Sequence, residues 1–428
     1  MWKLQKRKLQ EKLTMTPIQE PDTYTSIVDM GLIWRLAAPT TEDREKGDST
    51  KYTWGDYRKK VVRTVLTRRK NAEQIICVND PYDQRWIIKD SEHMLRQKSA
   101  SVSNIYMKSE DKFPAINDFH LPLGKAENKI RLQVFLQVGF QSTADTSAVE
   151  IFFCIGPWEK KNCTGQPAPQ FACSRAEADT AMLFIYSVLR SEGYTEAVIL
   201  VTEDIDNYVQ AAFVAQQISG ILCLKRKTQF ITSRSLCDEE MAACIIPLNV
   251  LTGCDHNSGF YGTSKKLAVD RILSSKGASD LLASCGTELP APKEVLDDVE
   301  KFVIRYIYCD GRNTTLGEVR AAKWWAQKNT VRLAPDSNSL HLHLKRTNYL
   351  SFLVKHPNLQ LHPSPIGHEW HLLDGLCLPV RYTQPPLPTS IPLPLNPDDK
   401  DMDTDSESDN GDAADSDRDS NGSSGVKQ

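Results

Sequence analysis

The stretch Ala197-Val-Ile-Leu-Val-Thr-Glu-Asp-Ile-Asp206 joins five consecutive apolar residues to a cluster of acids. An apolar run of this length predicts a strand that is buried on both faces, which is typical of a parallel sheet covered by helices. Two other runs, Thr25-Ser-Ile-Val-Asp29 and Gln74-Ile-Ile-Cys-Val-Asn-Asp80, are also expected to be strands that end in an acid. The sequence therefore predicts an α/β fold with a mostly parallel central sheet.

Further segments support the same alternation of strands and helices. Short strands are expected over 148–155 and 221–224, and helices over 57–70 and 181–190. Open parallel sheets bind ligands at the carboxyl ends of their strands, where the acids stand. The fold and the position of the acids therefore predict a site at this edge of the sheet.

Acids occupy five places in this pattern. Asp29 and Asp80 end strands, Glu177-Ala-Asp179 opens a helix, Asp204-Ile-Asp206 follows the most apolar strand, and Asp255 ends Leu251-Thr-Gly-Cys-Asp255. Mg²⁺ and Mn²⁺ prefer hard oxygen ligands, and a two-metal phosphodiesterase needs several carboxylates from different elements. Each acid taken alone has another interpretation, because Asp after a strand commonly caps a turn or a helix, and acids favour a helix N-terminus.

At these residues the chain resembles flap endonucleases and bacterial 5′-nucleases, which have a PIN-like fold. Val201-Thr-Glu-Asp-Ile-Asp206 is similar to their Thr-Glu-Asp-Met-Asp segment, and Ala176-Glu-Ala-Asp-Thr180 to their Glu-Ala-Asp-Asp segment. Leu251-Thr-Gly-Cys-Asp255 is similar to the stretch that carries their last metal-binding Asp. The resemblance implies a nuclease with two Mg²⁺ or Mn²⁺ ions. It also implies a ligand set of Asp29, Asp80, Glu177, Asp179, Asp204, Asp206 and Asp255.

A narrower resemblance, to mobile-element-derived proteins of animal genomes, covers nearly the whole folded part. It is carried by Leu340-His-Leu-His-Leu-Lys-Arg-Thr-Asn-Tyr349 and Pro363-Ser-Pro-Ile-Gly-His-Glu-Trp370, together with the acidic segments. Those proteins often end in a Cys-rich tail, whereas this chain ends in an acidic, Ser-rich one. Two patterns also depart from the nucleases: the turn over 258–264 keeps only part of their Gly-Ile-Gly-Pro motif, and Asn207 follows the second acid pair where an apolar residue is usual.

Basic residues are candidates for contact with a nucleic acid. By the resemblance to flap endonucleases, Lys89 and Arg96 correspond to cationic residues that stabilise charge on the scissile phosphate, although they could also be solvated charges on a helix. Lys265 and Lys266 open a helix that would meet a phosphate, although Thr263 or Ser264 could simply cap this helix. A basic run near Trp54 and Tyr57 could contact a phosphate backbone or form a solvated helix face; it consists of Arg58, Lys59, Lys60, Arg63, Arg68, Arg69 and Lys70.

Composition bounds the class of protein. The chain has 428 residues with 40% hydrophobic and 25% charged residues, as is usual for a globular protein. It contains no apolar run of membrane-spanning length, and residues 1–13 lack the apolar run of a signal peptide. Eleven scattered cysteines without a CxxC pair argue against both a disulfide framework and a zinc site. We therefore expect a reducing compartment, and the basic run Lys225-Arg-Lys227 favours the nucleus over the cytosol.

Charge and proline content divide the chain further. Residues 398–428 carry 11 acidic and 3 basic residues, which leaves 49 basic and 44 acidic residues in the rest. This basic body suits a nucleic-acid partner, although solvated surface charge without a partner explains it equally well. We expect DNA rather than RNA as the partner, and the tail could bind a protein. We expect an N-terminal extension (1–24), a PIN-like 5′-nuclease domain (25–275), a mainly helical C-terminal region (276–384), a Pro-rich linker (385–397) and a disordered acidic tail (398–428).

Three functions remain open on the sequence alone. The first is an active structure-selective nuclease, which the complete set of acids favours. The second is a catalytically inactive, domesticated nucleic-acid-binding module, and the third is a protein-interaction scaffold. The altered turn and tail favour these two alternatives.

Overall fold

A computed structural model describes most of the chain up to residue 381. The described residues are 13–381 except 40–51, 68, 70, 83–87, 89–102, 115–121, 145–148, 155–159, 163, 261–263, 276, 310, 312 and 328–332. Residues up to Thr383 form one compact unit. The Pro-rich linker and the acidic tail predicted over 385–428 lie outside the described residues.

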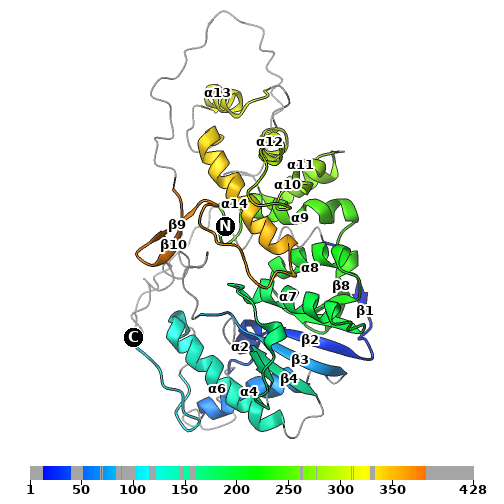
Figure 1. Ribbon diagram of the computed structural model, residues 1–428, viewed down its shortest axis with the longest axis vertical. Coiled ribbons are helices and arrows are strands. Elements are labelled where there is room, and N and C mark those ends of the chain that lie inside the picture. Colours follow the sequence, from blue (N-terminus) through cyan, green and yellow to red (C-terminus); the bar gives the residue numbers. More distant parts are fainter. Residues whose placement is uncertain are drawn as a thin grey trace, which may run out of the picture. The chain divides into compact units, whose positions relative to one another are not determined.

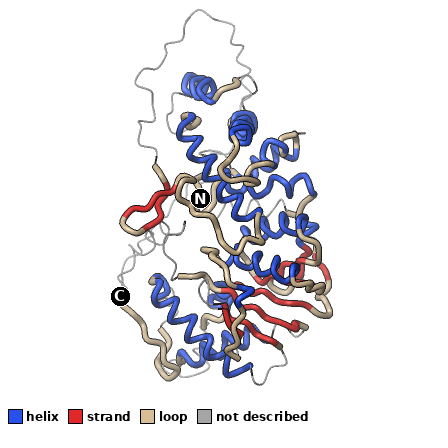
Figure 2. Tube along the Cα trace, in the orientation of Figure 1, coloured by secondary structure: helices blue, strands red, loops and turns tan. Residues whose placement is uncertain are grey.

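An eight-stranded sheet forms the centre of the described part, with the strand order β1-β8-β7-β6-β2-β3-β4-β5 (Figures 1 and 2). Five neighbouring strands, from β7 to β4, run parallel, and the outer strands are antiparallel. The strands are β1 (Pro17–Ile18), β2 (Tyr24–Asp29), β3 (Ala72–Val78), β4 (Glu150–Cys154), β5 (Lys160–Asn162), β6 (Ala197–Val201), β7 (Leu222–Arg226) and β8 (Gln229–Thr232).

Helices cover both faces of this sheet, as Figure 1 shows. One face packs against α2 (Met30–Leu36), α4 (Trp54–Thr67) and α6 (Ala126–Ala144). The other packs against α7 (Ala178–Ser191), α8 (Ile205–Gln217) and α9 (Glu239–Leu251). Side chains alternate between the two faces along each strand. In β6, Leu200 packs among the helices α7, α8 and α9, and Ile199 packs among α2, α4 and α6. Because both sides are buried, the strands read as continuous apolar runs.

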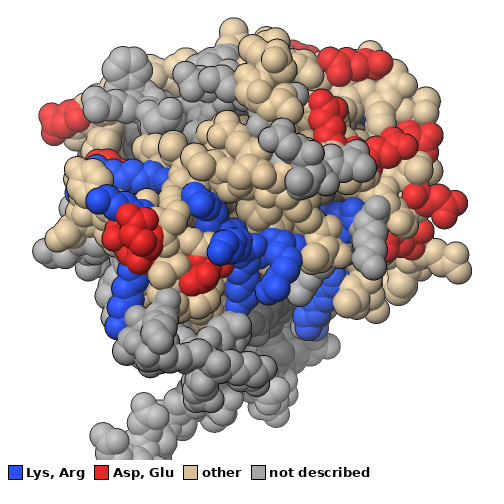
Figure 3. Space-filling view, turned by 90° about the horizontal axis from the view of Figure 1, so that it is seen from below, with Lys and Arg blue, Asp and Glu red and all other residues tan. Residues whose placement is uncertain are grey.

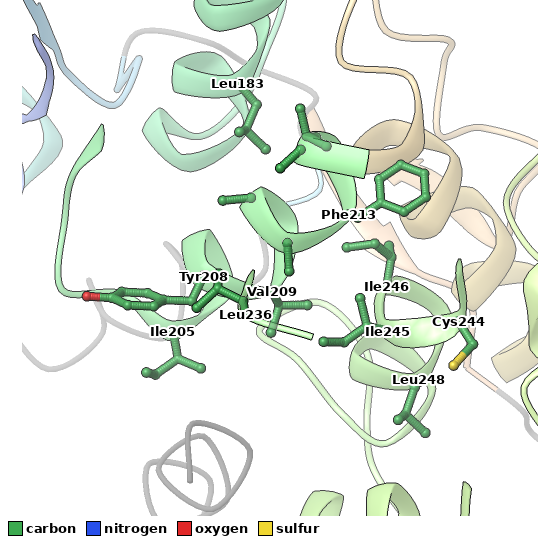
Figure 4. Packing of buried hydrophobic residues seen from close by; sticks show 14 of the residues in the cluster. Leu183, Ile205, Tyr208, Val209, Phe213, Leu236, Cys244, Ile245, Ile246 and Leu248 are labelled. Atoms are coloured by element: carbon green, nitrogen blue, oxygen red, sulfur yellow. The ribbon is translucent and has the colours of Figure 1, made fainter. Parts of the chain in front are cut away.

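The second face is the thicker layer, since α9 packs on α8 rather than on the sheet. Figure 4 shows Val209 and Phe213 of α8 beside Ile245 and Ile246 of α9. All four side chains are buried. This packing fixes α8, whose N-terminus carries Asp204 and Asp206, between the sheet and α9.

The C-terminal part of the compact unit is mainly helical. It consists of α10 (Lys265–Leu273), α11 (Asp280–Ala283), α12 (Lys293–Phe302), a π-helical turn (Val303–Ile307), α13 (Leu316–Gln327), α14 (Ser337–Lys355) and the hairpin of β9 (Trp370–Leu373) and β10 (Leu376–Pro379). Short 3-10 helices span Pro122–Gly124, Pro169–Phe171 and Ser233–Ser235. The helix α14 packs closely on α9, so this part shares its core with the preceding fold.

The predicted α/β class with a mostly parallel sheet is confirmed. The expected strands exist with ends displaced by at most two residues, and the expected helix over 57–70 starts three residues earlier, at Trp54. The helices α6 and α9 and the antiparallel strands were not expected. The basic run Lys225-Arg-Lys227 ends β7 and begins the tight turn into β8. None of the described helices is both long and apolar enough to cross a lipid bilayer.

Replacement of Leu200 tests the importance of the doubly covered sheet. Its side chain is 0% exposed in the centre of β6, so Leu200→Ala should lower the free energy of unfolding by about 2–5 kcal/mol. Leu267→Ala on α10, where the leucine is 38% exposed, is the matched control and should change it by about 0.5 kcal/mol or less. Urea denaturation measures both. Equal losses in the two variants would contradict this packing.

Candidate metal centre

Three of the acids lie at the carboxyl ends of three adjacent strands. Asp29 is the last residue of β2, Asp80 follows the end of β3 by two residues, and Asp204 follows the end of β6 by three. These strands are neighbours in the order β6-β2-β3 and run parallel, so all three ends meet at one edge. The strand register therefore brings together carboxylates that are up to 175 residues apart in the sequence.

Asp29 also begins the helix that follows its strand. One carboxylate oxygen, Oδ1, accepts a hydrogen bond of 2.8 Å from the amide of Gly31, as an N-cap residue does. Burial and, to a lesser extent, the charge of Asp80 together raise the pKa of Asp29 to about 6, against the opposing effect of the Gly31 amide. Asp29 and Asp80 are therefore close enough to repel each other.

Asp80 is tied to the Glu177-Ala-Asp179 segment. Its Oδ1 accepts a hydrogen bond of 2.8 Å from the amide of Ala178, which stands between the two acids. The hydroxyl of Tyr82 donates to its Oδ2 at 3.2 Å, and Gln133 of α6 donates to its main-chain carbonyl at 2.9 Å. The start of α7 is thereby held against the end of β3.

Asp204 and Asp206 lie at the start of α8. Asp204 caps this helix, since its Oδ1 accepts a hydrogen bond of 3.0 Å from the amide of Asp206. The capping interpretation is therefore correct for Asp29 and for Asp204. It does not account for Asp206, whose Oδ1 accepts a hydrogen bond of 3.3 Å from the side chain of Asn249 on α9.

Asn207 stands where the nuclease pattern has an apolar residue, and its polar side chain has a structural role here. Its side chain is fully buried, and its Nδ2 donates to Asp179 at 2.7 Å and to the hydroxyl of Thr202 at 3.1 Å. An apolar residue here could not donate to the carboxylate of Asp179. The amide links the first turn of α7 to the first turn of α8, so both acid pairs keep a fixed spacing.

The Leu251-Thr-Gly-Cys-Asp255 loop completes the site. Gly253 has a φ of +111°, and a Cβ atom added to it would lie 2.9 Å from the amide nitrogen of Gly259. This close approach needs glycine and folds the loop back on itself. The amide of Cys254 then donates to the carbonyl of Asn257 at 2.9 Å. Asp255 and His256 lie in this tight turn.

Four of the acids line one cavity of about 70 Å³ together with His256. Glu177 and Asp179 come from the start of α7, Asp206 from α8, and Asp255 from the loop after α9. The imidazole Nε2 of His256 lies 2.9 Å from Oε1 of Glu177. The sequence did not indicate His256, because a single His beside an Asp has no spacing that is typical of a site.

The carboxylates surround this cavity without converging on one point. In the part of the chain that the structure describes, no three His, Cys, Asp or Glu side chains form a group that could hold a metal ion. Like charges repel, so carboxylates gathered without a cation tend to stay apart. Amide donors instead hold the acids individually, as Asn207 does for Asp179 and Asn249 for Asp206.

Arg175 connects this site to the C-terminal helices. Arg175 is 2% exposed, and burial lowers its pKa to about 10. It donates to main-chain carbonyls in the last turn of α14 and in the segment just after it. These carbonyls belong to Leu353 (3.2 Å), His356 (3.0 Å), Pro357 (2.9 Å) and Leu359 (3.1 Å). Arg175 thereby anchors the segment that leads into Glu177.

The predicted nucleic-acid contacts on α4 are placed at the surface. Lys59 and Arg63 are exposed and Arg58 is half-buried. Figure 3, which views the molecule from the α4 and α6 side of Figure 1, shows Lys and Arg gathered in a band. Arg69 is different, because it is 2% exposed and donates to Ser26 and to carbonyls at the end of α4. Its assignment to a basic surface run was wrong.

The other basic candidates have different outcomes. Lys265 is 1% exposed, and its Nζ donates to the carbonyl of Asn249 at 2.7 Å and to the side chain of the same residue. The structure thus places it in the interior, as a support for Asn249. Lys266 is half-buried, and Ser264 caps the helix that both lysines open. Lys89 and Arg96 lie outside the described residues, as do Arg68 and Lys70.

The raised pKa of Asp29 predicts a pH-dependent effect of Asp29→Asn. A folded-state pKa of about 6 against 3.8 means that Asp29 contributes stability below about pH 4, and that this contribution is lost as the pH rises through 6. In EDTA at pH 8, the neutral variant should therefore be more stable than the wild type by about 1–3 kcal/mol. The difference should shrink toward pH 4. Urea denaturation at both pH values measures it.

A control for this prediction is Asp298→Asn on α12, where the carboxylate is exposed and pairs with Lys301 at 2.8 Å. Exposed ion pairs contribute about 0–1 kcal/mol, so this variant should show little gain at either pH. If Asp29→Asn were no more stable than the wild type at pH 8, the negative charge of Asp29 would not destabilise the folded protein, and the raised pKa would be contradicted.

Comparison with models of known protein families finds none that matches this chain, and comparison with curated proteins finds no match either.

Proposed function

We propose that this chain is a divalent-metal-dependent, structure-selective nuclease with a PIN-like fold, which hydrolyses phosphodiester bonds in nucleic acid. The observation that carries the proposal is the meeting of acids from separate segments at one sheet edge. Glu177, Asp179, Asp206 and Asp255 line a single cavity, and Asp80 is hydrogen-bonded to the amide between the first two. Such a concentration of like charge is costly unless a cation compensates for it.

The donor set fits Mg²⁺ or Mn²⁺. The acids around the cavity offer carboxylate oxygens, which are the ligands that these hard cations prefer. Glu177, Asp179, Asp206 and Asp255 would hold the ions, with Asp29, Asp80 and Asp204 beside them. The pKa of about 6 at Asp29 reflects burial and the charge of Asp80, a cost that a nearby cation would offset.

Bound divalent ions would supply an activated water molecule and stabilisation of negative charge on the phosphate. The chain itself supplies orientation. Asn207 and Asn249 direct Asp179 and Asp206, and His256 contacts Glu177. Outer partners of this kind matter in metal sites, since their loss typically costs about 10-fold to 100-fold in affinity or activity.

The basic surface of α4 would hold the nucleic acid. Lys59 and Arg63 are exposed one helical turn apart, and Arg58 lies beside them. Contacts of Lys and Arg with phosphates give affinity that falls with salt and does not depend on sequence. We take DNA as the preferred substrate, in accord with the resemblance to flap endonucleases.

A catalytically inactive nucleic-acid-binding module is the second candidate. The observation that favours it is that Asp29 and Asp204 serve as helix caps, a structural role that would retain them without catalysis. The two candidates differ in metal binding and in cleavage.

Metal binding predicts a gain in stability. An ion that binds only the folded chain stabilises it by about 2.7 kcal/mol at 100 times its dissociation constant. Thermal denaturation with Mn²⁺ or Mg²⁺ should therefore shift to higher temperature in the wild type. The shift should be lost in Asp206→Asn and retained in Asp298→Asn, whose carboxylate is far along the sequence and exposed on α12. An equal shift in both variants would place the ions elsewhere.

Cleavage tests the activity directly. Labelled 5′-flap, nicked and single-stranded DNA and RNA should be cut with Mg²⁺ or Mn²⁺ and left intact in EDTA. Asp204→Asn/Asp206→Asn should reduce the rate by about 100-fold or more, because groups that stabilise charge in the transition state contribute on this scale. If the folded wild type cuts none of these substrates, the inactive module is the better account.

A further inference from the structure

Tyr106 is an aromatic side chain that the fold holds at the surface. It is 72% exposed, the largest exposed fraction among the large hydrophobic side chains described. The guanidinium carbon of Arg131, on α6, lies 4.4 Å from the centre of its ring. The same guanidinium donates to the carbonyl of Ile105 at 3.3 Å. The guanidinium group of Arg131 thus lies against the ring of Tyr106 and is also hydrogen-bonded to the preceding residue of the backbone.

The loop that carries Tyr106 is fixed to α6 by a buried amide. Asn128 is fully buried; its Oδ1 accepts from the amide of Ile105 at 2.9 Å, and its Nδ2 donates to the carbonyl of Ser103 at 3.1 Å. Since Asn128 and Arg131 are three residues apart, both face the loop from the same side of the helix. Tyr106 is therefore held in place while its ring remains exposed.

A second pair of a cation and an aromatic ring follows one turn along α6. Phe135 is four residues after Arg131 and hence on the same side of the helix, about 6 Å further along its axis. The guanidinium carbon of Arg58, on α4, lies 4.7 Å from the centre of the Phe135 ring. Arg58 packs into the seam between the helices, because a Cβ atom added to Gly139 would lie 2.7 Å from its Cγ.

These two pairs form a strip of alternating rings and guanidinium groups, which we call the α4–α6 strip: Tyr106, Arg131, Phe135 and Arg58. Lys59 and Arg63, on the same helix as Arg58, are exposed. Aromatic rings that stack with bases, beside cations that contact phosphates, are the two components of sites for single-stranded nucleic acid.

The strip is also close to the candidate metal centre. The opposite side of α6 reaches Asp80 through Gln133, which donates to its main-chain carbonyl at 2.9 Å. On that side Lys129 lies 4.3 Å from the ring centre of Tyr82, whose hydroxyl donates to Asp80. One helix, about 10 Å in diameter, thus lies between the strip and the contacts with Asp80.

We propose that the α4–α6 strip binds single-stranded nucleic acid, with Tyr106 stacking on a base and Arg131 holding both the ring and a phosphate. The inference rests on the proposed nuclease function for its class of ligand. It goes further by assigning the binding of an unpaired strand to residues of α6 and the loop before it. Tyr106 is a binding residue in this account, because its ring contacts a base.

The test uses the full chain in EDTA, where no cleavage occurs. Fluorescence anisotropy measures binding of labelled (dT)20, (rU)20 and an abasic DNA strand of equal length. Tyr106→Ala should weaken binding of the base-containing strands by about 5-fold to 100-fold and leave the abasic strand nearly unaffected. Tyr106→Phe, which keeps the ring, should bind like the wild type. Arg131→Gln should weaken all three strands and lower the salt dependence by about one phosphate contact.

The matched control is Trp325→Ala, since Trp325 is an aromatic residue of α13 that is 47% exposed and lies outside the strip. It should bind like the wild type. Absence of binding by the wild type, equal binding by Tyr106→Ala, or an equal loss on the abasic strand would each overturn the proposal. Comparison of (dT)20 with (rU)20 shows which nucleic acid the strip prefers.

The result also separates the strip from the proposed function. If the wild type binds through Tyr106 but cuts nothing with Mn²⁺, the strip stands and the nuclease proposal fails. If the wild type cuts and Tyr106→Ala cuts and binds equally well, the nuclease proposal stands and the strip fails.

Discussion

The repulsion between carboxylates at the end of a parallel sheet is the constraint that organises this structure. Parallel register places Asp29, Asp80 and Asp204 at neighbouring strand ends, where the folded chain must accommodate their charges. The pKa of Asp29 records the cost, because burial and Asp80 raise it to about 6. A chain selected for stability alone would not need to gather acids in this way, since neutral residues could cap the same helices.

Much of the surrounding structure serves to hold these acids in place. Buried amides connect elements that begin at the site: Asn207 joins α7 to α8, and Asn249 joins α9 to Asp206. Lys265 is buried and donates a hydrogen bond to the carbonyl of Asn249, which helps to hold this residue in place. Arg175 fastens the segment before Glu177 to the end of α14. The C-terminal helices therefore belong to the same physical unit as the sheet edge, and they stabilise the geometry of the acids.

The sequence predicted the features that depend on local pattern. Doubly buried strands give continuous apolar runs, so the parallel sheet and the strand-ending acids could be found from Ala197–Val201 and its counterparts. Burial of individual charges could not be predicted. Arg69 and Lys265 are of residue types that usually lie at the surface. Only tertiary packing buries them and lets them donate hydrogen bonds to main-chain carbonyls. His256 meets Glu177 through a loop that closes 79 residues later, a contact that no local spacing encodes.

The helix α6 shows the same limit for function. Its apolar residues follow no strong amphipathic pattern, because Val134 and Val138 are exposed while Asn128 and Gln133 are buried. These two buried amides are the ones that attach the Tyr106 loop and Asp80 to the helix. An element that the sequence did not indicate thus connects the basic surface with the acids.

The most direct measurement of the central claim is anomalous diffraction from crystals of the chain soaked in Mn²⁺. Two manganese peaks are expected among the carboxylates of Glu177, Asp179, Asp206 and Asp255, with the remaining acids alongside. Manganese bound only elsewhere, or an unchanged arrangement of these carboxylates with no ion between them, would contradict the proposed metal site.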